Sequence, residues 1–302
     1  MYLKTTWRAG KTIDVQHTFS RRYGKNIRRG INTETTPPPV KEYNRKMAER
    51  KLTRLLNANF KARDIHLVLT YRRDDRPPPE EAKKRLRNFI GRLRRFFTRR
   101  GQELKYIAAT AYGTKGAIHH HLVISTMDAR ELRSLWPYGG SHAEYLYESG
   151  DYARLAAYIV RQAKHGLAEA DQIDEKKWHG SRNLIRPKPH KQEVPATVWR
   201  EPPAAWPGYI IDLDSVDAGV SPVTGIPYLF YRMLKIPPKQ KLQTPDGRIL
   251  YDDAAAKWLR EYNRQEIRRE WQNLNQTGPI MKQERTGQYA NDGTTGAGGG
   301  KS

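Results

Sequence analysis

Three consecutive histidines occupy positions 119–121, inside an apolar run that has the composition of a buried strand. Successive side chains of a strand point to opposite faces, so His119 and His121 share one face, while Ile118, Leu122 and Ile124 take the other. Two imidazoles on one face can hold one divalent metal ion. A surface histidine cluster, or histidines that only hydrogen-bond to their neighbours, would give the same pattern. The spacing therefore predicts a metal site without naming the metal.

A second candidate group lies on a helix that we expect Asp151 to cap and that should end near His165. Arg154, Tyr158 and Arg161 recur every three or four residues and therefore share one stripe of this helix. The phenol pKa is about 10, and flanking guanidinium groups favour the phenolate and can hold phosphate. The alternative is an amphipathic helix with a half-buried tyrosine and solvated arginines. The pattern predicts a tyrosine nucleophile between two phosphate ligands.

The charge balance indicates a polyanionic partner. The chain has 302 residues, with 55 Lys and Arg against 32 Asp and Glu, and a formal net charge of +23. Such an excess attracts phosphate backbones and predicts an affinity that falls with salt. We find no long apolar run, signal peptide or membrane-surface helix, so we expect a cytoplasmic protein without a membrane partner. The lack of cysteine excludes disulfides, thiolate nucleophiles and Cys-ligated zinc.

Hydrophobic periodicity predicts an α+β domain around the histidines. The expected strands are residues 64–71, 105–112, 118–125 and 141–147, and the expected helices between them are residues 80–100 and 128–136. This order is ferredoxin-like: one antiparallel sheet with helices on one face and the other face open. The third strand would lie between the first two and bring His66 beside His119 and His121. His66 is thus a candidate third metal ligand, although a surface histidine would fit equally well.

The remaining segments are expected to surround this domain. We expect a basic N-terminal arm over residues 1–40, a catalytic domain over 41–190 that starts with a helix at 41–60, an accessory region over 191–274 with a strand near 228–232 and a charged helix at 252–274, and a disordered tail over 275–302. The polar face of the helix at 80–100 is a candidate DNA-binding surface or simply a solvated face; it carries Lys83, Lys84, Arg87, Arg94 and Arg95.

Three short stretches, in order and spacing, resemble the motifs of one enzyme family. Residues 67–71 (LVLTY) look like its first motif, residues 119–121 its metal-binding motif, and residues 157–161 (AYIVR) the motif with the nucleophile. The chain resembles rolling-circle replication initiators of the HUH endonuclease superfamily, the replication-associated proteins of bacterial plasmids, integrative elements and single-stranded phages. The resemblance covers about residues 52–185.

The resemblance implies site-specific nicking and joining of single-stranded DNA at a replication origin. Tyr158 would form a 5′-phosphotyrosine and free a 3′-hydroxyl, with Mn²⁺ or Mg²⁺ on His119 and His121, and with an origin hairpin, a host helicase and a polymerase as partners. Arg161 departs from the lysine that the family usually has. No carboxylate faces the histidines from residues 108–111, so His66, Gln162 or water would complete the metal site.

Other readings of the same residues remain open. A conjugative relaxase or a single-strand transposase would use the same chemistry in another setting. A non-catalytic single-stranded nucleic-acid-binding protein could use the same sheet topology, with bases stacked on aromatic side chains. Tyr152, six residues before Tyr158, faces a different direction on the helix, so a single nucleophilic tyrosine is expected.

Overall fold

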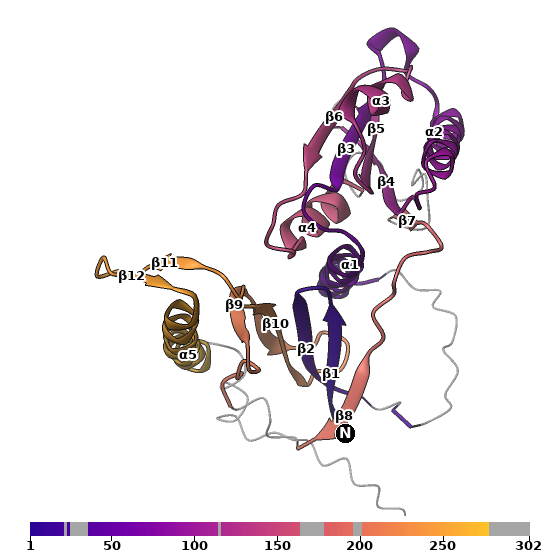
Figure 1. The fold of residues 1–302 in the computed structure, drawn as a ribbon. Coiled ribbons are helices and arrows are strands. Elements are labelled where there is room, and N and C mark those ends of the chain that lie inside the picture. Colours follow the sequence, from indigo (N-terminus) through magenta and orange to yellow (C-terminus); the bar gives the residue numbers. More distant parts are fainter. Residues whose placement is uncertain (21–22, 25–35, 114–115, 164–177, 196–200, 278–302) are drawn as a thin grey trace, which may run out of the picture.

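The computed structural model describes residues 1–20, 23–24, 36–113, 116–163, 178–195 and 201–277, which form two antiparallel sheets and the helices packed on them (Figure 1). The first sheet has the strand order β6-β3-β5-β4-β7. Its strands are β3 (Ile65–Thr70), β4 (Tyr106–Tyr112), β5 (Ile118–Ile124), β6 (Ser141–Tyr145) and β7 (His179–Gly180). The α+β class and the position of β5 between β3 and β4 are confirmed.

The two helices that connect these strands pack on one face of the first sheet, as predicted. They are α2 (Pro79–Arg99) and α3 (Ala129–Ser134), and a short 3-10 turn, η1 (Arg73–Asp75), precedes α2. Phe89 and Leu93 of α2 are fully buried against Leu67 and Leu122 of the sheet. The side chain of Asp128 caps α3 by accepting hydrogen bonds from the backbone N–H groups of residues 130 and 131, as expected for an N-cap aspartate.

The opposite face of the first sheet is not open, which corrects the prediction of helices on one face only. Helices α1 (Pro38–Asn59) and α4 (Ala153–Gln162) pack on it, and both bury apolar side chains against Ile107 and Val123. These two strand residues point away from α2, so β4 and β5 are apolar on both faces and require cover on both. The uncovered part of this face is confined to the histidine end of β3, β5 and β6.

The predicted cap of α4 is wrong. The residue at the N-cap position is Tyr152, and no side chain caps this helix. Asp151 instead accepts a hydrogen bond from Asn57 at 2.9 Å and lies 3.4 Å from the guanidinium of Arg232. Buried partners elsewhere in the fold thus hold the carboxylate that the local sequence offered to the helix.

The expected N-terminal arm is a buried β-hairpin. Strands β1 (Tyr2–Ala9) and β2 (Thr12–Phe19) pair through a tight turn at Gly10, whose φ is +58°. The apolar side chains of Leu3, Ile13 and Val15 are almost fully buried, which explains why these residues do not extend into solvent. The basic residues that suggested an arm alternate with these apolar ones along the strands.

The hairpin completes a second sheet together with the C-terminal region, in the order β8-β1-β2-β10-β9. The other strands are β8 (His190–Val194), β9 (Tyr209–Val220) and β10 (Pro227–Lys235), and a separate small sheet contains β11 (Lys241–Gln243) and β12 (Ile249–Tyr251). Helix α5 (Asp252–Thr277) buries Ile267 and Trp271 on one face of the second sheet. The predicted strand and charged helix are confirmed. The expected disordered tail begins inside α5, and its residues 278–302 lie outside the described part of the chain.

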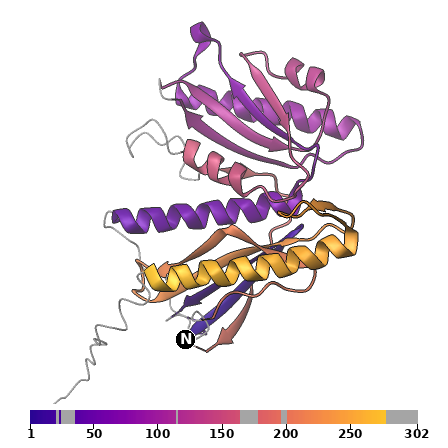
Figure 2. The same cartoon turned by 90° about the vertical axis from the view of Figure 1, so that its left-hand side faces the viewer.

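Helix α1 lies between the two sheets, as Figure 2 shows. Its apolar side packs on α4, whereas its polar side contacts the second sheet through a buried ion cluster. Asp14 accepts from the Nε of Arg232 at 2.7 Å and from the Nη1 of Arg54 at 3.2 Å. This cluster ties the N-terminal hairpin, α1 and β10 together. No helix in the described ranges combines the length and the apolar character needed to cross a bilayer.

His17 on β2 gives the fold a specific sensitivity to acid. Its imidazole is buried, and neither ring nitrogen has a hydrogen-bond partner among the described residues. Burial, assisted by Lys4 on the paired strand, lowers the pKa of His17 from 6.5 to about 4. The unfolded chain therefore binds this proton at higher pH than the folded chain, and stability is lost as the pH falls from 6.5 towards 4.

We expect His17→Leu to remove about 3 kcal/mol of the loss in unfolding free energy between pH 7 and pH 4. Urea denaturation of both proteins at the two pH values measures this difference. The other buried histidines titrate equally in both proteins, so they cancel in the comparison. An unchanged pH dependence in the variant would contradict the assignment to His17.

Candidate active site

Tyr158 and the histidine pair meet at the uncovered end of the first sheet. The rings of His66 and His121 are nearly parallel, at 10°, with centroids 5.6 Å apart. The ring of Tyr158 stands edge-on to both, at 5.2 Å from His121 and 6.2 Å from His66. His119 lies 4.9 Å from His121. The structure thus brings together four of the residues predicted from sequence, and Tyr158, 38 % exposed, faces solvent.

Strand register explains why the imidazoles converge. On β3 and β5, Val68 pairs with His121 and Thr70 with His119, so His66 is one alternating position further along the same face. On the other side of β5, alanines at positions 109 and 111 pair with the two histidines. The expected absence of a carboxylate there is confirmed.

Burial keeps the imidazoles of the site neutral. It lowers the pKa of His121 to about 3, with further lowering by His119 and His66. Burial also lowers the pKa of His66, against the opposing charge of Glu144, and the pKa of His119. A neutral imidazole has a ring nitrogen free to bind a metal ion, whereas an imidazolium does not. The site therefore presents metal-binding forms of histidine at neutral pH.

The donor atoms of two histidines fit a metal ion. The Nδ1 of His121 lies 3.4 Å from the Nε2 of His66, and two nitrogens at about 2.1 Å from one ion lie roughly 3–3.5 Å apart. The Nε2 of His121 is buried without a hydrogen-bond partner among the described residues. Over the same residues, no group of three or more His, Cys, Asp or Glu side chains is arranged to hold a metal. The chain thus offers two ready imidazole ligands and requires water or a rotated His119 for the rest.

The flanking arginines differ in their contacts. Arg154 extends into solvent and lies 3.6 Å from the carboxylate of Asp214 on β9, on the opposite side of a cleft. Arg161 turns back onto its own helix, where its Nε donates to the carbonyl oxygen of Ala157 at 3.2 Å. Gln162 is half-buried one turn beyond Tyr158. Their proposed roles with phosphate and metal remain predictions.

The site opens into a cleft of about 1140 Å³ between the two sheets. His66, Tyr158 and Arg154 line one wall, and the carboxylates of Asp212 and Asp214 on β9 line the other. Sequence reasoning missed this second wall because β9 follows the histidines by about ninety residues and carries no motif that links it to them. An acidic wall repels phosphate, so a nucleic-acid strand is directed towards the histidine wall.

Two further residues on the edge strand β6 also line the cleft. His142 pairs with Val68 and Glu144 pairs with His66, and the two side chains are joined at 2.9 Å. Alternation within the predicted strand at 141–147 could have identified them, since it places both on one face. Glu144 is the carboxylate nearest in register to His66.

His120, the middle histidine, faces the opposite way and is fully buried among aromatic residues. Its Nε2 lies 2.8 Å from the hydroxyl of Tyr71 and its Nδ1 2.9 Å from the hydroxyl of Thr110. Burial lowers the pKa of His120 to about 3. Both ring nitrogens are thus occupied by core hydrogen bonds, and His120 has a structural role.

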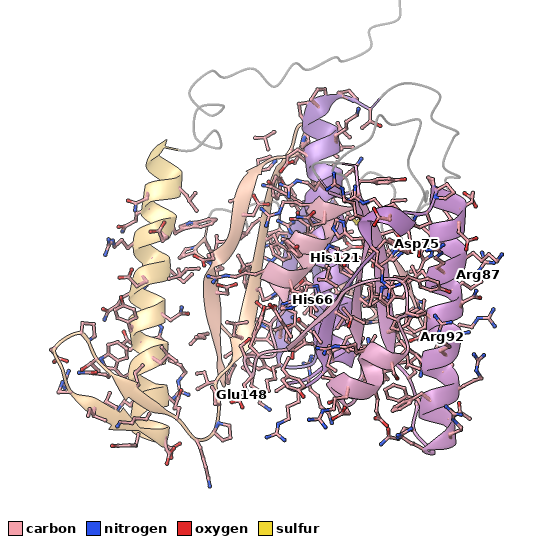
Figure 3. All side chains as sticks on the ribbon, turned by 90° about the horizontal axis from the view of Figure 1, so that it is seen from above. His66, Asp75, Arg87, Arg92, His121 and Glu148 are labelled. Atoms are coloured by element: carbon pink, nitrogen blue, oxygen red, sulfur yellow. The ribbon has the colours of Figure 1, made fainter. Side chains whose placement is uncertain are left out.

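The predicted DNA-binding surface of α2 lies on the far side of the first sheet from the histidines. Figure 3 shows Arg87 pointing outward from α2, whereas His66 and His121 lie together beyond the sheet. Lys83 and Lys84 pair with glutamates one turn earlier on the same helix. The structure does not bring this surface, which also includes Arg94 and Arg95, to the tyrosine.

One family comparison covers the site. Residues 64–163 match the model of a family of replication-associated proteins, the ORF2 family. No curated protein and no solved structure matches the chain. The matched segment runs from the start of β3 to the end of α4 and contains His66, His119, His121 and Tyr158. Residues 64–163 of this chain therefore form a domain of the ORF2 family of replication-associated proteins, in agreement with the resemblance to rolling-circle replication initiators.

Proposed function

We propose that this protein nicks and rejoins single-stranded DNA at a replication origin. The observation that supports this most is the contact of the solvent-exposed Tyr158 ring with the rings of His66 and His121. The family match supports a role in replication, and the net charge of +23 supports a nucleic-acid substrate.

In the proposed reaction the Tyr158 oxygen attacks the phosphorus of the scissile phosphodiester. The bond from phosphorus to the 3′ oxygen breaks, which leaves a 5′-phosphotyrosine on the protein and a free 3′-hydroxyl on the DNA. The reverse attack by a 3′-hydroxyl restores the phosphodiester without ATP. Arg154, which extends from the same helix wall into the cleft, supplies a cation for the phosphate.

His66, His121 and His119 are the residues that would hold a divalent ion, Mn²⁺ or Mg²⁺. When bound, the ion supplies Lewis-acid polarisation of the phosphodiester oxygens. The protein's own contribution is to keep the imidazoles neutral by burial and to hold the tyrosine ring against them.

A chain that only binds single-stranded nucleic acid would not form a covalent product. Incubation with single-stranded origin DNA and Mn²⁺, followed by a denaturing gel, separates the two functions. The nickase yields a protein–DNA adduct that a chelator prevents. Strong DNA binding without any adduct in the presence of metal would favour the non-catalytic protein.

We expect His121→Ala to reduce adduct formation by at least roughly 100-fold, because it removes a buried metal ligand. Binding of single-stranded DNA should stay within about two-fold, since His121 is 1 % exposed and offers little surface to DNA. His179→Ala, at an exposed histidine on the edge strand β7, is the matched control and should leave both quantities unchanged. Equal losses of adduct and binding in His121→Ala would assign this residue a structural role instead.

A further inference from the structure

A groove lies on the second sheet, away from the cleft of the first. The side chains of Lys4, Thr6 and Arg8 alternate along β1 and share one face, and β8 adds His190 and Gln192 opposite them. Together with Lys188 and Trp206 these residues line a cavity of about 580 Å³. We refer to these seven residues as the β1–β8 groove.

The groove exists because α5 covers only part of this face. On β2, Ile13 and Val15 point to the same side as Lys4 and Arg8, and they are buried beneath Ile267 of α5. On β1 the corresponding positions are polar and basic, so burial under an apolar helix would be unfavourable there. The edge of the sheet nearest β8 is therefore left open to solvent.

The charge of the groove is one-sided. Its lining contains three cations, Lys4, Arg8 and Lys188, and no carboxylate. The carboxylate of Glu193 belongs to the opposite face, because it pairs with Leu3 and alternates with the groove residue Gln192. Such a lining is complementary to a phosphate backbone, in contrast to the acidic β9 wall of the cleft at Tyr158.

Trp206 supplies a rigid aromatic wall. Its backbone N–H donates to the sulfur of Met233 at 3.3 Å, and its ring packs on the apolar cluster under α5. The guanidinium of Arg8 lies 5.3 Å from the ring centroid. An indole fixed by the core, with a guanidinium beside it and cations along the adjoining strands, has the properties of a platform for an unpaired base.

We propose that the β1–β8 groove is a second binding site for single-stranded DNA, with a base against Trp206 and phosphates on Lys4, Arg8 and Lys188. The proposal rests on the proposed function only for the identity of the nucleic acid, since the groove shares no residue with the histidine–tyrosine site. It gives the protein a contact to the origin strand beyond the nucleotides at the nick.

The test measures binding of labelled oligo-dT by fluorescence anisotropy as a function of salt, in a Tyr158→Phe background so that no strand is cleaved. The triple variant Lys4→Ala, Arg8→Ala, Lys188→Ala should bind more weakly. It should also lower the slope of log affinity against log salt by about 2, since each phosphate contact on a single strand contributes roughly 0.7. Trp206→Ala should weaken binding roughly five- to 150-fold.

A matched triple variant carries the same loss of charge elsewhere. Lys239→Ala, Lys241→Ala, Arg248→Ala lies in and beside the exposed β11–β12 hairpin, which is outside the second sheet. The proposal predicts an unchanged salt slope for this control. Equal effects of the two triple variants would mean bulk attraction only and would overturn it, as would an unchanged affinity of the groove triple variant or a preference for duplex DNA over oligo-dT.

Folding and catalysis are controlled separately. The three lysine and arginine changes lie on exposed or half-exposed positions, so the groove triple variant should melt like the parent protein even where Trp206→Ala is destabilised. With Tyr158 restored, the groove triple variant should still form the covalent adduct at saturating DNA. Failure of the adduct assay in the parent protein would refute the proposed nicking reaction and leave the binding result on the groove unaffected.

Discussion

Tyr158→Phe is expected to reduce the rate of covalent adduct formation by roughly 10⁴-fold or more, while the affinity for single-stranded DNA stays within about two-fold. The substitution removes one oxygen and keeps the ring that packs edge-on against His66 and His121. The loss therefore reports on the nucleophile and not on the shape of the site. Single-turnover assays with end-labelled DNA in Mn²⁺ measure the rate.

Two other tyrosines near the site allow the result to be interpreted. Tyr145→Phe, at an exposed tyrosine of β6 that does not line the cleft, is the matched control and should react like the wild type. Tyr152 is fully buried, and burial raises its pKa to about 12, so it is a poor substitute nucleophile. A Tyr158→Phe protein that still forms the adduct at the wild-type rate would place the nucleophile elsewhere.

Asp14→Ala is expected to lower the free energy of unfolding by about 3–5 kcal/mol, because it leaves buried guanidinium groups without their carboxylate. Asp14 is 1 % exposed and contacts both Arg232 and Arg54. Burial by itself would lower the pKa of Arg232, and the charges of Asp14 and Asp151 outweigh this and raise it. The carboxylate of Asp14 thus stabilises a charge that the second sheet has removed from water.

Urea denaturation at neutral pH measures this effect. The control is Asp246→Ala, which removes a fully exposed carboxylate paired with Arg248 and should leave the denaturation midpoint unchanged. If Asp14→Ala were no more destabilising than Asp246→Ala, the ion cluster between α1 and the second sheet would have no measurable role in stability.

The ferredoxin-like unit could be predicted from sequence because its signals are local. The alternation of residues 65–70 and 118–124 and the helical spacing of Phe89 and Leu93 each specify one element, and the order of elements specifies the sheet. The second sheet could not be predicted. Its strands β1 and β2 pair with β8 and β10, about 190 and 215 residues later, and no local pattern encodes such a pairing.

The site followed the same division. The two-residue spacing of His119 and His121 and the register with β3 were sufficient to bring His66 and the histidine pair together. The contact of Tyr158 required α4 to pack across the sheet, which the resemblance implied and periodicity alone did not. Asp214 joins the cleft only through β9, and this contact depends on the second sheet.

The most direct measurement of the central claim is the identity of the residue that carries DNA after nicking. The adduct formed with a short origin strand and Mn²⁺ would be digested with protease and nuclease, and the modified peptide located by tandem mass spectrometry. The account predicts a nucleotide 5′-phosphate on Tyr158. A modification on any other residue, or a nicked strand that leaves no modified peptide, would contradict it.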